Sequence, residues 1–318
     1  MRIRFGYVST ATSLWECSPS RTVTFKRYSE LPEAERMQKL LEITAQNIQN
    51  TKRILYFNLA HEIEVYRLSS SIVPLATHPE VEWDFVTPFE TEWRELGDLI
   101  TKNKLRVSFH PNQFTLFTSS KNSITQNAVK DMAYHYKMFV AMGVQHNSYL
   151  NIHVGGAYGD KPASIERFHK NLAALPAHIK HKMTLENDDK TYTAEETLAV
   201  CQKESIPLAF DIHHHMANPG TLSLSELLPK IFQTWEHTGI LPKIHISSPK
   251  NEKEFRFHAD YVDLDFILPL INDLKALGKD VDFMVEAKTK DKAMLKLIED
   301  ISKIRSIKRI SGGAVQIK

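Results

Sequence analysis

Acids and histidines recur in this sequence at the ends of short apolar runs, where their side chains could hold metal ions. The run that ends in FDIHHH, residues 210–215, places Asp211 and three histidines within five positions. Residues of the same two kinds end five other apolar runs or lie near their ends: His110, His153, Glu186, His245 and Glu286. Imidazoles and carboxylates without thiolates suit Mn²⁺ or Zn²⁺, and the oxygen content favours Mn²⁺. We therefore expect a centre that binds Mn²⁺, with Zn²⁺ or Mg²⁺ as alternatives.

Each of these residues has an ordinary explanation when it is taken alone, because a histidine or glutamate at a strand end is usually solvated or capped. Six of them at equivalent positions favour a shared role, since burying so many without a cation would leave unpaired charge. In the chain, Glu186 lies after His110 and His153 and before Asp211, so it could bridge two ions. Two ions about 3.5–4 Å apart stabilise both the attacking and the leaving oxygen of a phosphoryl displacement.

The elements that would position these residues are eight β-type runs that alternate with helical patterns. The runs span residues 3–8, 53–59, 105–110, 149–153, 182–186, 207–211, 242–247 and 281–286. This alternation predicts parallel strands, and eight of them predict an α/β fold of the TIM (β/α)8 barrel type, in which the carboxyl ends of the strands share one face. An open doubly wound sheet is the alternative. It would usually carry a glycine-rich turn after the first strand, where this chain has STATSLWECS, residues 9–18.

The helical patterns carry their own boundary signals. They cover residues 33–53, 123–143, 193–205, 263–280 and 290–306. Gly143 and Gly278 are candidate C-caps, Thr193 and Glu196 have the spacing of a capping box, and Pro269 predicts a kink. No linker or break in composition divides the chain, so we predict a single domain over residues 1–318.

Composition limits the class of protein. With 42% hydrophobic and 25% charged residues, the chain can bury a sizeable core, and a net charge of +2 neither requires nor excludes nucleic acid as a partner. Cys17 and Cys201 form no disulfide framework, which favours a reducing compartment. The N-terminus lacks an apolar leader, and no apolar stretch is long enough to span a membrane. We expect a monomer in the cytoplasm, associated with the nucleoid if the source is bacterial.

Two segments near the predicted ligands could extend the centre. Lys243 and His245 lie two apart on one strand and so face the same side. An ammonium beside divalent ions is unfavourable, so Lys243 could lose its proton or react with CO₂ to form a carbamate ligand. The alternative is contact with a substrate phosphate or a carboxylate. His258, with Asp260, could close a further site beside His214, or HADY could be an exposed polar loop.

Motifs in order along nearly the whole chain carry a resemblance to a known family. They are RLSSSIVPLATHP (67–79), FHPNQF (109–114), HVGG (153–156), ENDD (186–189), FDIHHH (210–215), KIHISSP (243–249), HADY (258–261) and MVEAKTKD (284–291). Together they resemble the UV damage endonuclease family, which is related to AP endonucleases of the endonuclease IV type. The resemblance implies a barrel with three metal ions, often Mn²⁺. It also implies nicking of double-stranded DNA immediately 5′ of pyrimidine dimers and 6-4 photoproducts, which leaves a 3′-hydroxyl and a 5′-phosphate.

The resemblance also implies roles for individual residues. Glu186 matches the bridging carboxylate, Lys243 the lysine that is carboxylated in the family, and His78 a histidine that contacts the phosphate. The other ligands fall into three groups: His110 with His153, Asp211 with His245 and Glu286, and His214 with His258.

The same resemblance implies contacts with DNA. Gln113 and Phe114 match a pair that wedges into the helix at the lesion, which is easier to extrude than normal bases because its stacking is already weakened. Family members can have Gly before this pair and Tyr in place of Phe114, whereas this chain has Asn112 and Phe114. Further expected contacts are Asn112 beside the wedge, Tyr7 as an aromatic wall, and Lys288 and Lys290 at phosphates. The alternatives are ordinary loop packing for Phe114 and a solvated helix start for the lysines.

Other functions remain open on the sequence. A divalent-metal sugar isomerase or epimerase uses the same kind of barrel, but typically has two metals and no aromatic wedge, so His214, His258 and Phe114 favour the nuclease. A plain AP endonuclease is a closer variant. A binding protein without activity should have lost ligands, and none of the expected ones is missing.

Overall fold

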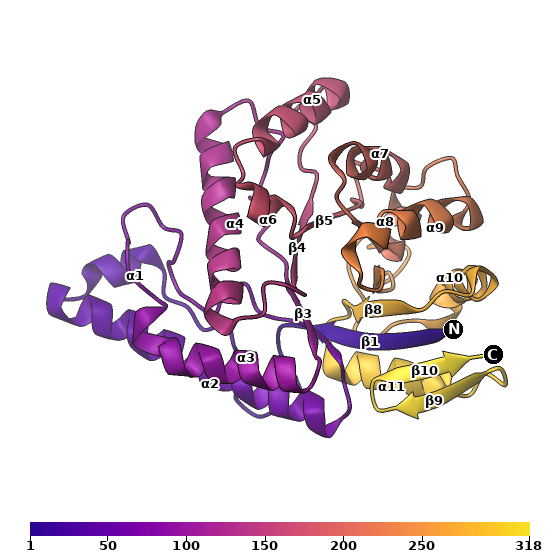
Figure 1. Ribbon diagram of the computed structural model, residues 1–318, viewed down its shortest axis with the longest axis horizontal. Coiled ribbons are helices and arrows are strands. Elements are labelled where there is room, and N and C mark those ends of the chain that lie inside the picture. Colours follow the sequence, from indigo (N-terminus) through magenta and orange to yellow (C-terminus); the bar gives the residue numbers. More distant parts are fainter.

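Eight parallel strands close into a barrel in the computed structural model, which describes residues 1–318 (Figure 1). Each strand pairs with the next, and β1 pairs with both β8 and β2, which closes the ring. The TIM-barrel prediction is therefore confirmed. The strands are β1 (Arg2–Val8), β2 (Val65–Arg67), β3 (Arg106–Phe109), β4 (Tyr149–His153), β5 (Met183–Glu186), β6 (Leu208–Asp211), β7 (Lys243–Ile246) and β8 (Val281–Val285).

The predicted second strand, residues 53–59, is wrong. These residues continue helix α2 (Glu33–Ala60), and the second strand is β2, which is three residues long. The buried positions of α2 run on through Thr51, Ile54, Leu55 and Asn58 at intervals of three or four, whereas Tyr56 is exposed. The apolar run thus belongs to one face of a long helix, because its burial follows the helical period and not the alternation of a strand.

Ten other α-helices surround the barrel. They are α1 (Phe25–Glu30), α3 (Glu90–Lys102), α4 (Asn122–Met142), α5 (Lys161–Leu172), α6 (Ala177–Lys180), α7 (Ala194–Glu204), α8 (Ile212–Ala217), α9 (Leu224–Gln233), α10 (Leu264–Leu277) and α11 (Asp291–Ile301). Of these, α4, α7, α10 and α11 agree with the predicted ranges to within a few residues, and the other six were not predicted. Gly143 and Gly278 cap α4 and α10 in the left-handed conformation, and Thr193 and Glu196 form the predicted capping box. Helix α10 continues through Pro269. None of the helices combines the length and apolar character needed to cross a membrane.

A C-terminal hairpin that the sequence did not predict extends the sheet beside β1. Strands β9 (Ile307–Ser311) and β10 (Ala314–Ile317) lie next to β1 in Figure 1. Residues Arg2–Arg4 of β1 pair with β10, and residues Gly6–Val8 pair with β2, so one edge of β1 serves two partners. Gly6 permits this, because a Cβ there would lie 2.3 Å from the carbonyl oxygen of Val65. The two chain ends consequently meet, and the N-terminal ammonium donates to Ile317 O at 3.0 Å.

The amino end of the barrel is closed by a buried ion cluster above a core of 70 apolar residues. The carboxylate of Asp282 on β8 accepts from Arg4 on β1 at 2.6 Å and pairs with Arg106 on β3 at 2.5 Å. Burial would raise the pKa of Asp282, but Arg106 and Arg4 hold it below its ordinary value. This end of the barrel is therefore fixed by charge pairing that depends on the ionised Asp282.

We expect Asp282→Asn to lower the free energy of unfolding by about 3–5 kcal/mol, because it leaves Arg106 buried without its charged partner. A carboxylate with a lowered pKa stabilises the fold fully above its ordinary pKa of about 3.9 and loses this contribution as the pH falls. The variant should therefore lose less stability than the parent between pH 7 and pH 3 (about one unit below that value). Urea unfolding at both pH values measures this.

Asp98→Asn is the control, because Asp98 on α3 pairs with Lys102 at the surface and both side chains are largely exposed. Its effect should stay within about 0.5 kcal/mol. A loss no larger than this for Asp282→Asn would contradict the role assigned to the buried cluster.

Candidate metal centre

The carboxyl ends of six consecutive strands, β3 to β8, bring seven of the predicted ligands together. Three groups have ligand atoms within 4.8 Å of one another: His110, His153 and Glu186; Glu186, Asp211 and His214; and Glu186, His245 and Glu286. Glu186 belongs to all three groups. This follows from the fold, because parallel strands place their last residues side by side, as in the pairing of His153 with Glu186 and of Asp211 with His245.

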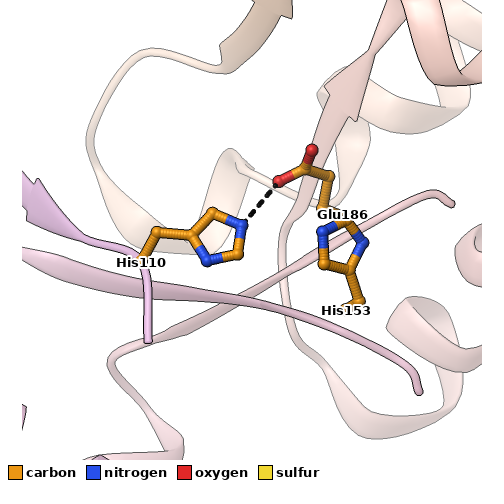
Figure 2. A group of neighbouring side chains, drawn as sticks. All are labelled: His110, His153 and Glu186. Carbon is orange, nitrogen blue, oxygen red and sulfur yellow. Dashed lines mark ion pairs between the residues drawn. The ribbon is translucent and has the colours of Figure 1, made fainter. Parts of the chain in front are cut away.

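The Glu186 carboxylate is the geometric centre of the cluster. One oxygen, Oε2, lies 3.3 Å from Nε2 of His110 and 3.1 Å from Nδ1 of His245, and the other, Oε1, lies 3.3 Å from Nδ1 of His214. Figure 2 shows His110 turned toward this carboxylate, with His153 beside it. The Asn151 amide on β4 donates to Oε2, and the Thr184 hydroxyl donates to Asn151, which fixes the carboxylate from behind.

Charge pairing within the cluster shifts the pKa values of its members. Burial would raise the pKa of Glu186, but His245 and His153 hold it well below its ordinary value. Burial would lower the pKa of His214, but Asp211 and Glu186 raise it to about 11. Burial would likewise lower the pKa of His245, but Glu186 and then Glu286 raise it to about 9. Glu186 and Glu286 are therefore ionised, and their negative charge must be balanced by positive charge within the cluster.

Three buried polar atoms of the cluster have no hydrogen-bond partner, and they fit a cation. They are Nδ1 of His153, Oδ2 of Asp211 and Nδ1 of His245. Nδ1 of His245 lies 3.1 Å from Glu186 and 3.0 Å from Glu286, but neither contact has the geometry of a hydrogen bond. Buried polar atoms in proteins are normally hydrogen-bonded, so three such atoms in the ligand groups around Glu186 need an explanation. Asp211 itself is well fixed, because its Oδ1 caps α8 by accepting from the backbone N–H of His214 at 2.8 Å. The donor set of imidazole nitrogens and carboxylate oxygens suits divalent transition ions.

Two predicted ligands lie outside these groups. Nδ1 of His258 bonds to the carbonyl oxygen of Glu286, which leaves Nε2 for any ligand bond, and the His258 ring lies 6.4 Å from the His214 ring. The Lys243 amine donates to Ser108 Oγ at 2.8 Å inside the barrel. Burial, and then Arg106, lower the pKa of Lys243 well below its ordinary value, which favours loss of its proton.

Three residues expected at the DNA surface have different surroundings. The ring of Tyr7 is fully buried and its hydroxyl donates to Asn58 Oδ1 at 2.6 Å, so the structure gives the expected aromatic wall no exposed surface, and its contact with DNA stays a prediction. His78 does not join the cluster, because its ring stacks on Phe25 with centroids 4.0 Å apart. The Asn112 side chain accepts from the backbone N–H of Phe114 and shapes its own turn.

The remaining predicted DNA contacts are at the surface. Phe114 is 71% exposed, and Gln113 is exposed beside it. Lys288 is exposed, and Lys290 begins α11 with a φ of 55° and is partly buried. Burial, and then Arg67, lower the pKa of Lys290. Phe114, Gln113 and Lys288 are therefore accessible to a binding partner. Lys290 is partly buried near the charged groups of Arg67 and Glu286.

Arg67 is a residue of the site that the sequence reasoning missed. It ends β2, and its guanidinium pairs with the Glu286 carboxylate. Burial would raise the pKa of Glu286, but Arg67 and then His245 hold it well below its ordinary value. Placing the second strand at residues 53–59 hid Arg67. The signal was the short run Val65–Tyr66, directly before the RLSSS motif.

His213 ties together the segments that carry two other histidines. Its Nδ1 bonds to Ser247 Oγ at 2.8 Å and its Nε2 donates to Phe255 O at 2.6 Å. His214 follows it on α8, and His258 lies three residues beyond Phe255. His213 therefore has both ring nitrogens engaged and serves the structure of the centre, not its ligand set.

The largest cavity opens at the other end of the barrel, among residues that precede β3, β4, β7 and β8. Arg106 and Trp235 line it, and none of the predicted metal ligands does. The candidate site is thus identified by its clustered charged side chains and by buried polar atoms without hydrogen bonds, not by cavity volume.

Comparison with known proteins decides the family. The family model described as UV-endonuclease UvdE matches residues 3–318. The chain belongs to this family. A UV DNA damage endonuclease of Bacillus cereus (strain 03BB102) is 60% identical over 316 residues, which cover 99% of this chain and 100% of the relative. One from Bacillus pumilus (strain SAFR-032) is 60% identical over 319 residues, with 100% of both chains covered.

Solved structures agree with the UvdE assignment. The crystal structure of SacUVDE superposes with a TM-score of 0.85 at 29% identity and covers 95% of this chain and 99% of that one. D-psicose 3-epimerase from Clostridium cellulolyticum H10 gives a TM-score of 0.52 at 11% identity, with 89% and 85% covered. The epimerase shares the barrel fold alone, so the fold by itself does not separate the UvdE family from sugar-converting enzymes.

Proposed function

We propose that this UvdE-family protein is a DNA repair endonuclease. It nicks the phosphodiester immediately 5′ of pyrimidine dimers and 6-4 photoproducts by metal-dependent hydrolysis and leaves a 3′-hydroxyl and a 5′-phosphate. The observation that carries the proposal is the single buried carboxylate, Glu186, shared by three ligand groups at the carboxyl end of the barrel. The family model that spans residues 3–318 supports DNA as the substrate of that centre.

We propose a centre of three divalent ions, with Mn²⁺ as the first candidate and Zn²⁺ or Mg²⁺ as alternatives. The family resemblance assigns His110 and His153 to one ion, Asp211, His245 and Glu286 to a second, His214 and His258 to a third, and Glu186 as the bridge. In the structure Asp211 lies in a group with His214 and Glu186, and the His258 ring is 6.4 Å from the His214 ring, so the division of ligands between the second and third ions is part of the proposal. Bound ions of this kind supply Lewis-acid chemistry, because they neutralise phosphate charge and make water a better nucleophile at neutral pH.

The chain's own cations would orient the DNA backbone at this centre. Arg67 pairs with Glu286, and Lys290 lies close enough for Arg67 and Glu286 to shift its pKa. A phosphate oxygen at this edge would receive donors from a guanidinium and an amine, which are the groups that bind phosphate well in proteins. Lys288 would contact the backbone further out, and His78 is proposed to reach a phosphate beyond the cluster.

The turn that carries Gln113 and Phe114 would supply lesion recognition. It directly follows His110, so the metal ligand and the exposed ring belong to one short segment. An aromatic ring can stack in the gap left when a weakly stacked dinucleotide leaves the helix. Because a photoproduct has already lost stacking, the same insertion costs more at undamaged sequence, which gives the enzyme its preference.

Phe114→Ala should lower the preference for damaged over intact duplex by about 5- to 100-fold, since stacking of one base on an aromatic ring contributes about 1–3 kcal/mol. Metal content should not change, because Phe114 touches no ligand group. The measurement is kcat/KM on one oligonucleotide duplex with and without a single thymine dimer. Phe257→Ala removes another exposed ring and is the control. An unchanged preference in Phe114→Ala would rule out the wedge.

We further propose that Lys243 is carboxylated. A buried neutral amine is the form that reacts with CO₂, in which the nitrogen lone pair bonds to carbon and one proton is released, giving a carbamate anion. Arg106 and Arg67 are among the charges that lower the pKa of Lys243, and they would compensate the new negative charge. The carbamate oxygens would then extend beyond the amine toward the ligands, where His245 faces the same side of β7.

With ¹³C-bicarbonate, the protein should show one carbamate signal in its ¹³C NMR spectrum that is absent from Lys243→Arg. Arginine has a similar length but cannot form a carbamate. Lys230→Arg on α9, whose side chain is exposed at the surface, should keep the signal. If Lys243→Arg kept it too, or if the parent gave none, Lys243 would act as an amine only.

The experiment that tests the function uses supercoiled plasmid, either UV-irradiated or untreated, incubated with the protein and Mn²⁺ or with EDTA. We expect nicking of irradiated plasmid alone and only with the metal. Nicking of plasmid with abasic sites but not of irradiated plasmid would identify a plain AP endonuclease. Epimerisation of a ketose without nicking would favour the sugar-converting alternative, whose structural likeness at 11% identity concerns the fold alone.

We also propose that the protein acts as a monomer in the cytoplasm. The relatives described above come from bacteria, in which the chromosome lies in that compartment. Light scattering of the purified chain would test the monomer, and fluorescence microscopy of a tagged chain would test its association with the nucleoid.

A further inference from the structure

The exposed pair Gln113–Phe114 forms the tip of a tight turn whose two ends are held by one buried carboxylate. The turn runs from Asn112 to Thr115, and the Thr115 N–H donates to the Asn112 carbonyl at 3.0 Å. Within the turn, Asn112 Oδ1 accepts from the Phe114 N–H at 2.8 Å. The ring of Phe114 is 71% exposed, whereas Thr115, the next residue, is buried. The turn therefore has a fixed base and a free tip.

Asp131, in the middle of helix α4, contacts both ends of this turn. Its Oδ2 accepts from the Thr115 hydroxyl at 2.5 Å and from the Asn112 amide at 3.4 Å. The carboxylate is buried, and its one possible ion-pair partner within 4.0 Å is the His135 ring, with Nδ1 3.7 Å from Oδ1; burial lowers the pKa of His135, which disfavours its charged form. The His135 ring is itself held by the carbonyl oxygen of Asp131 at 2.8 Å. A buried carboxylate without a Lys or Arg partner is unusual. The Asp131 carboxylate instead accepts hydrogen bonds from two side chains of the turn.

We infer that Asp131 is a positioning residue for lesion recognition: through Thr115 and Asn112 it holds the turn that presents Gln113–Phe114. This inference rests on the proposed wedge. It adds a residue that fixes the wedge, that belongs to none of the ligand groups and that is itself buried away from any DNA surface.

Stiffness matters because an exposed ring on a loose loop must be ordered each time it enters the helix. The entropy lost in ordering is subtracted from the stacking energy, so a ring that is already ordered binds the lesion more tightly. Anchoring the turn to α4, a helix of 21 residues, removes that loss in advance. The Ser70 hydroxyl also holds the His110 carbonyl oxygen at 2.6 Å, so the segment is fixed just before the turn as well.

The test is Thr115→Val, which keeps the shape of the side chain and removes only the hydroxyl that Asp131 accepts. We expect the preference for a duplex with one thymine dimer over the intact duplex to fall about 3- to 10-fold, as for an unpaired buried acceptor. The change should lie in KM, with kcat within about 2-fold, since His110 and the other ligands are untouched. The Phe114 amide should also exchange with solvent faster in the free protein.

Two control variants and a double-mutant cycle with Phe114→Ala test whether the hydroxyl of Thr115 acts through the ring. Thr115→Ser keeps the hydroxyl and should restore the parent preference. Thr118→Val makes the same change at another buried threonine, whose hydroxyl has no partner, and should have no effect. Thr115→Val in the Phe114→Ala background should lower the preference no further, because no ring remains to be positioned.

The outcomes separate this inference from the proposed function. If Phe114→Ala keeps full preference, the wedge fails. If Phe114→Ala lowers the preference and Thr115→Val behaves as Thr118→Val, the wedge stands and the role of Asp131 is refuted. An equal further loss in the Phe114→Ala background would also refute it, because Asp131 would then act by a route other than the ring.

Discussion

Glu186→Gln should abolish nicking of irradiated plasmid, a fall of well over about 100-fold, which is the upper range for residues that only support metal ligands. The amide has the same shape as the carboxylate but lacks its charge, and it replaces one of two acceptor oxygens by a donor. Oε2 meets His110 and His245 while Oε1 meets His214, so either orientation of the amide sets N–H groups against an imidazole. All three ligand groups lose their shared member at once.

The measurement combines nicking rate with metal content by atomic emission after dialysis against Mn²⁺. Both should fall in Glu186→Gln. Glu204→Gln is the control, because Glu204 on α7 is also largely buried and paired, with His169 and Lys180, but belongs to none of the ligand groups. It should keep parent activity and metal content. Full nicking by Glu186→Gln with parent metal content would show that no shared carboxylate is needed.

The convergence of the ligands was predictable from sequence because it depends on two regular features. A parallel barrel places the carboxyl ends of its strands on one face, and six of the nine predicted ligands lie at or next to such an end. His153 and Glu186 are 33 positions apart in the chain, yet they are partners in the β4–β5 register. The prediction needed only the strand ends to be right to within a residue or two, and for β3 to β8 they were.

The second strand could not be located in the same way. The run RILYFNL is apolar enough for a strand, and only its packing shows that the buried residues belong to a helical face. The true strand, Val65–Arg67, is too short to carry a recognisable alternation. The error concealed Arg67 and its contact with Glu286. Because a three-residue strand shows no recognisable sequence pattern, the functional residue at its end, Arg67, was not predicted.

Side-chain environments were predicted least well, because they depend on neighbours far apart in the chain. Tyr7 ends a strand on the site side, but Asn58 on α2 and Tyr66 on β2 cover it. Lys243, which was expected beside the ligands, has Ser108 as its hydrogen-bond partner, 135 positions away. No spacing in the sequence relates these pairs. The same holds for Asp131, whose value to the turn appears only when α4 is packed beside it.

The barrel fold by itself does not decide the reaction, because the epimerase structure shares this fold at 11% identity. Function on such a fold is carried by particular side chains, often on loops. In this chain the loop after β3 carries an exposed aromatic ring, and the loop after β7 carries His258 near His213 and His214. These two loops are therefore where the proposed contacts with DNA can be tested by substitution.

Removing divalent ions should abolish nicking and also lower the melting temperature, and the second effect does not depend on catalysis. The cluster holds ionised carboxylates and three unpaired buried atoms, so an ion that binds the folded chain alone stabilises it by mass action. At a free concentration of about 100 times Kd this amounts to about 2.7 kcal/mol. For a chain of 318 residues, that corresponds to roughly 4 °C.

The measurement is thermal unfolding after EDTA treatment, with Mn²⁺, Zn²⁺ or Mg²⁺ then added back, beside nicking under the same conditions. The ion that restores both properties at the lowest concentration is the best candidate for the native one. In Glu186→Gln the stabilisation by metal should be largely lost, whereas Glu204→Gln should keep it in full. Equal melting temperatures with and without metal, together with nicking in EDTA, would mean that the buried acids and imidazoles neutralise one another. The chemistry would then have to come from the side chains alone.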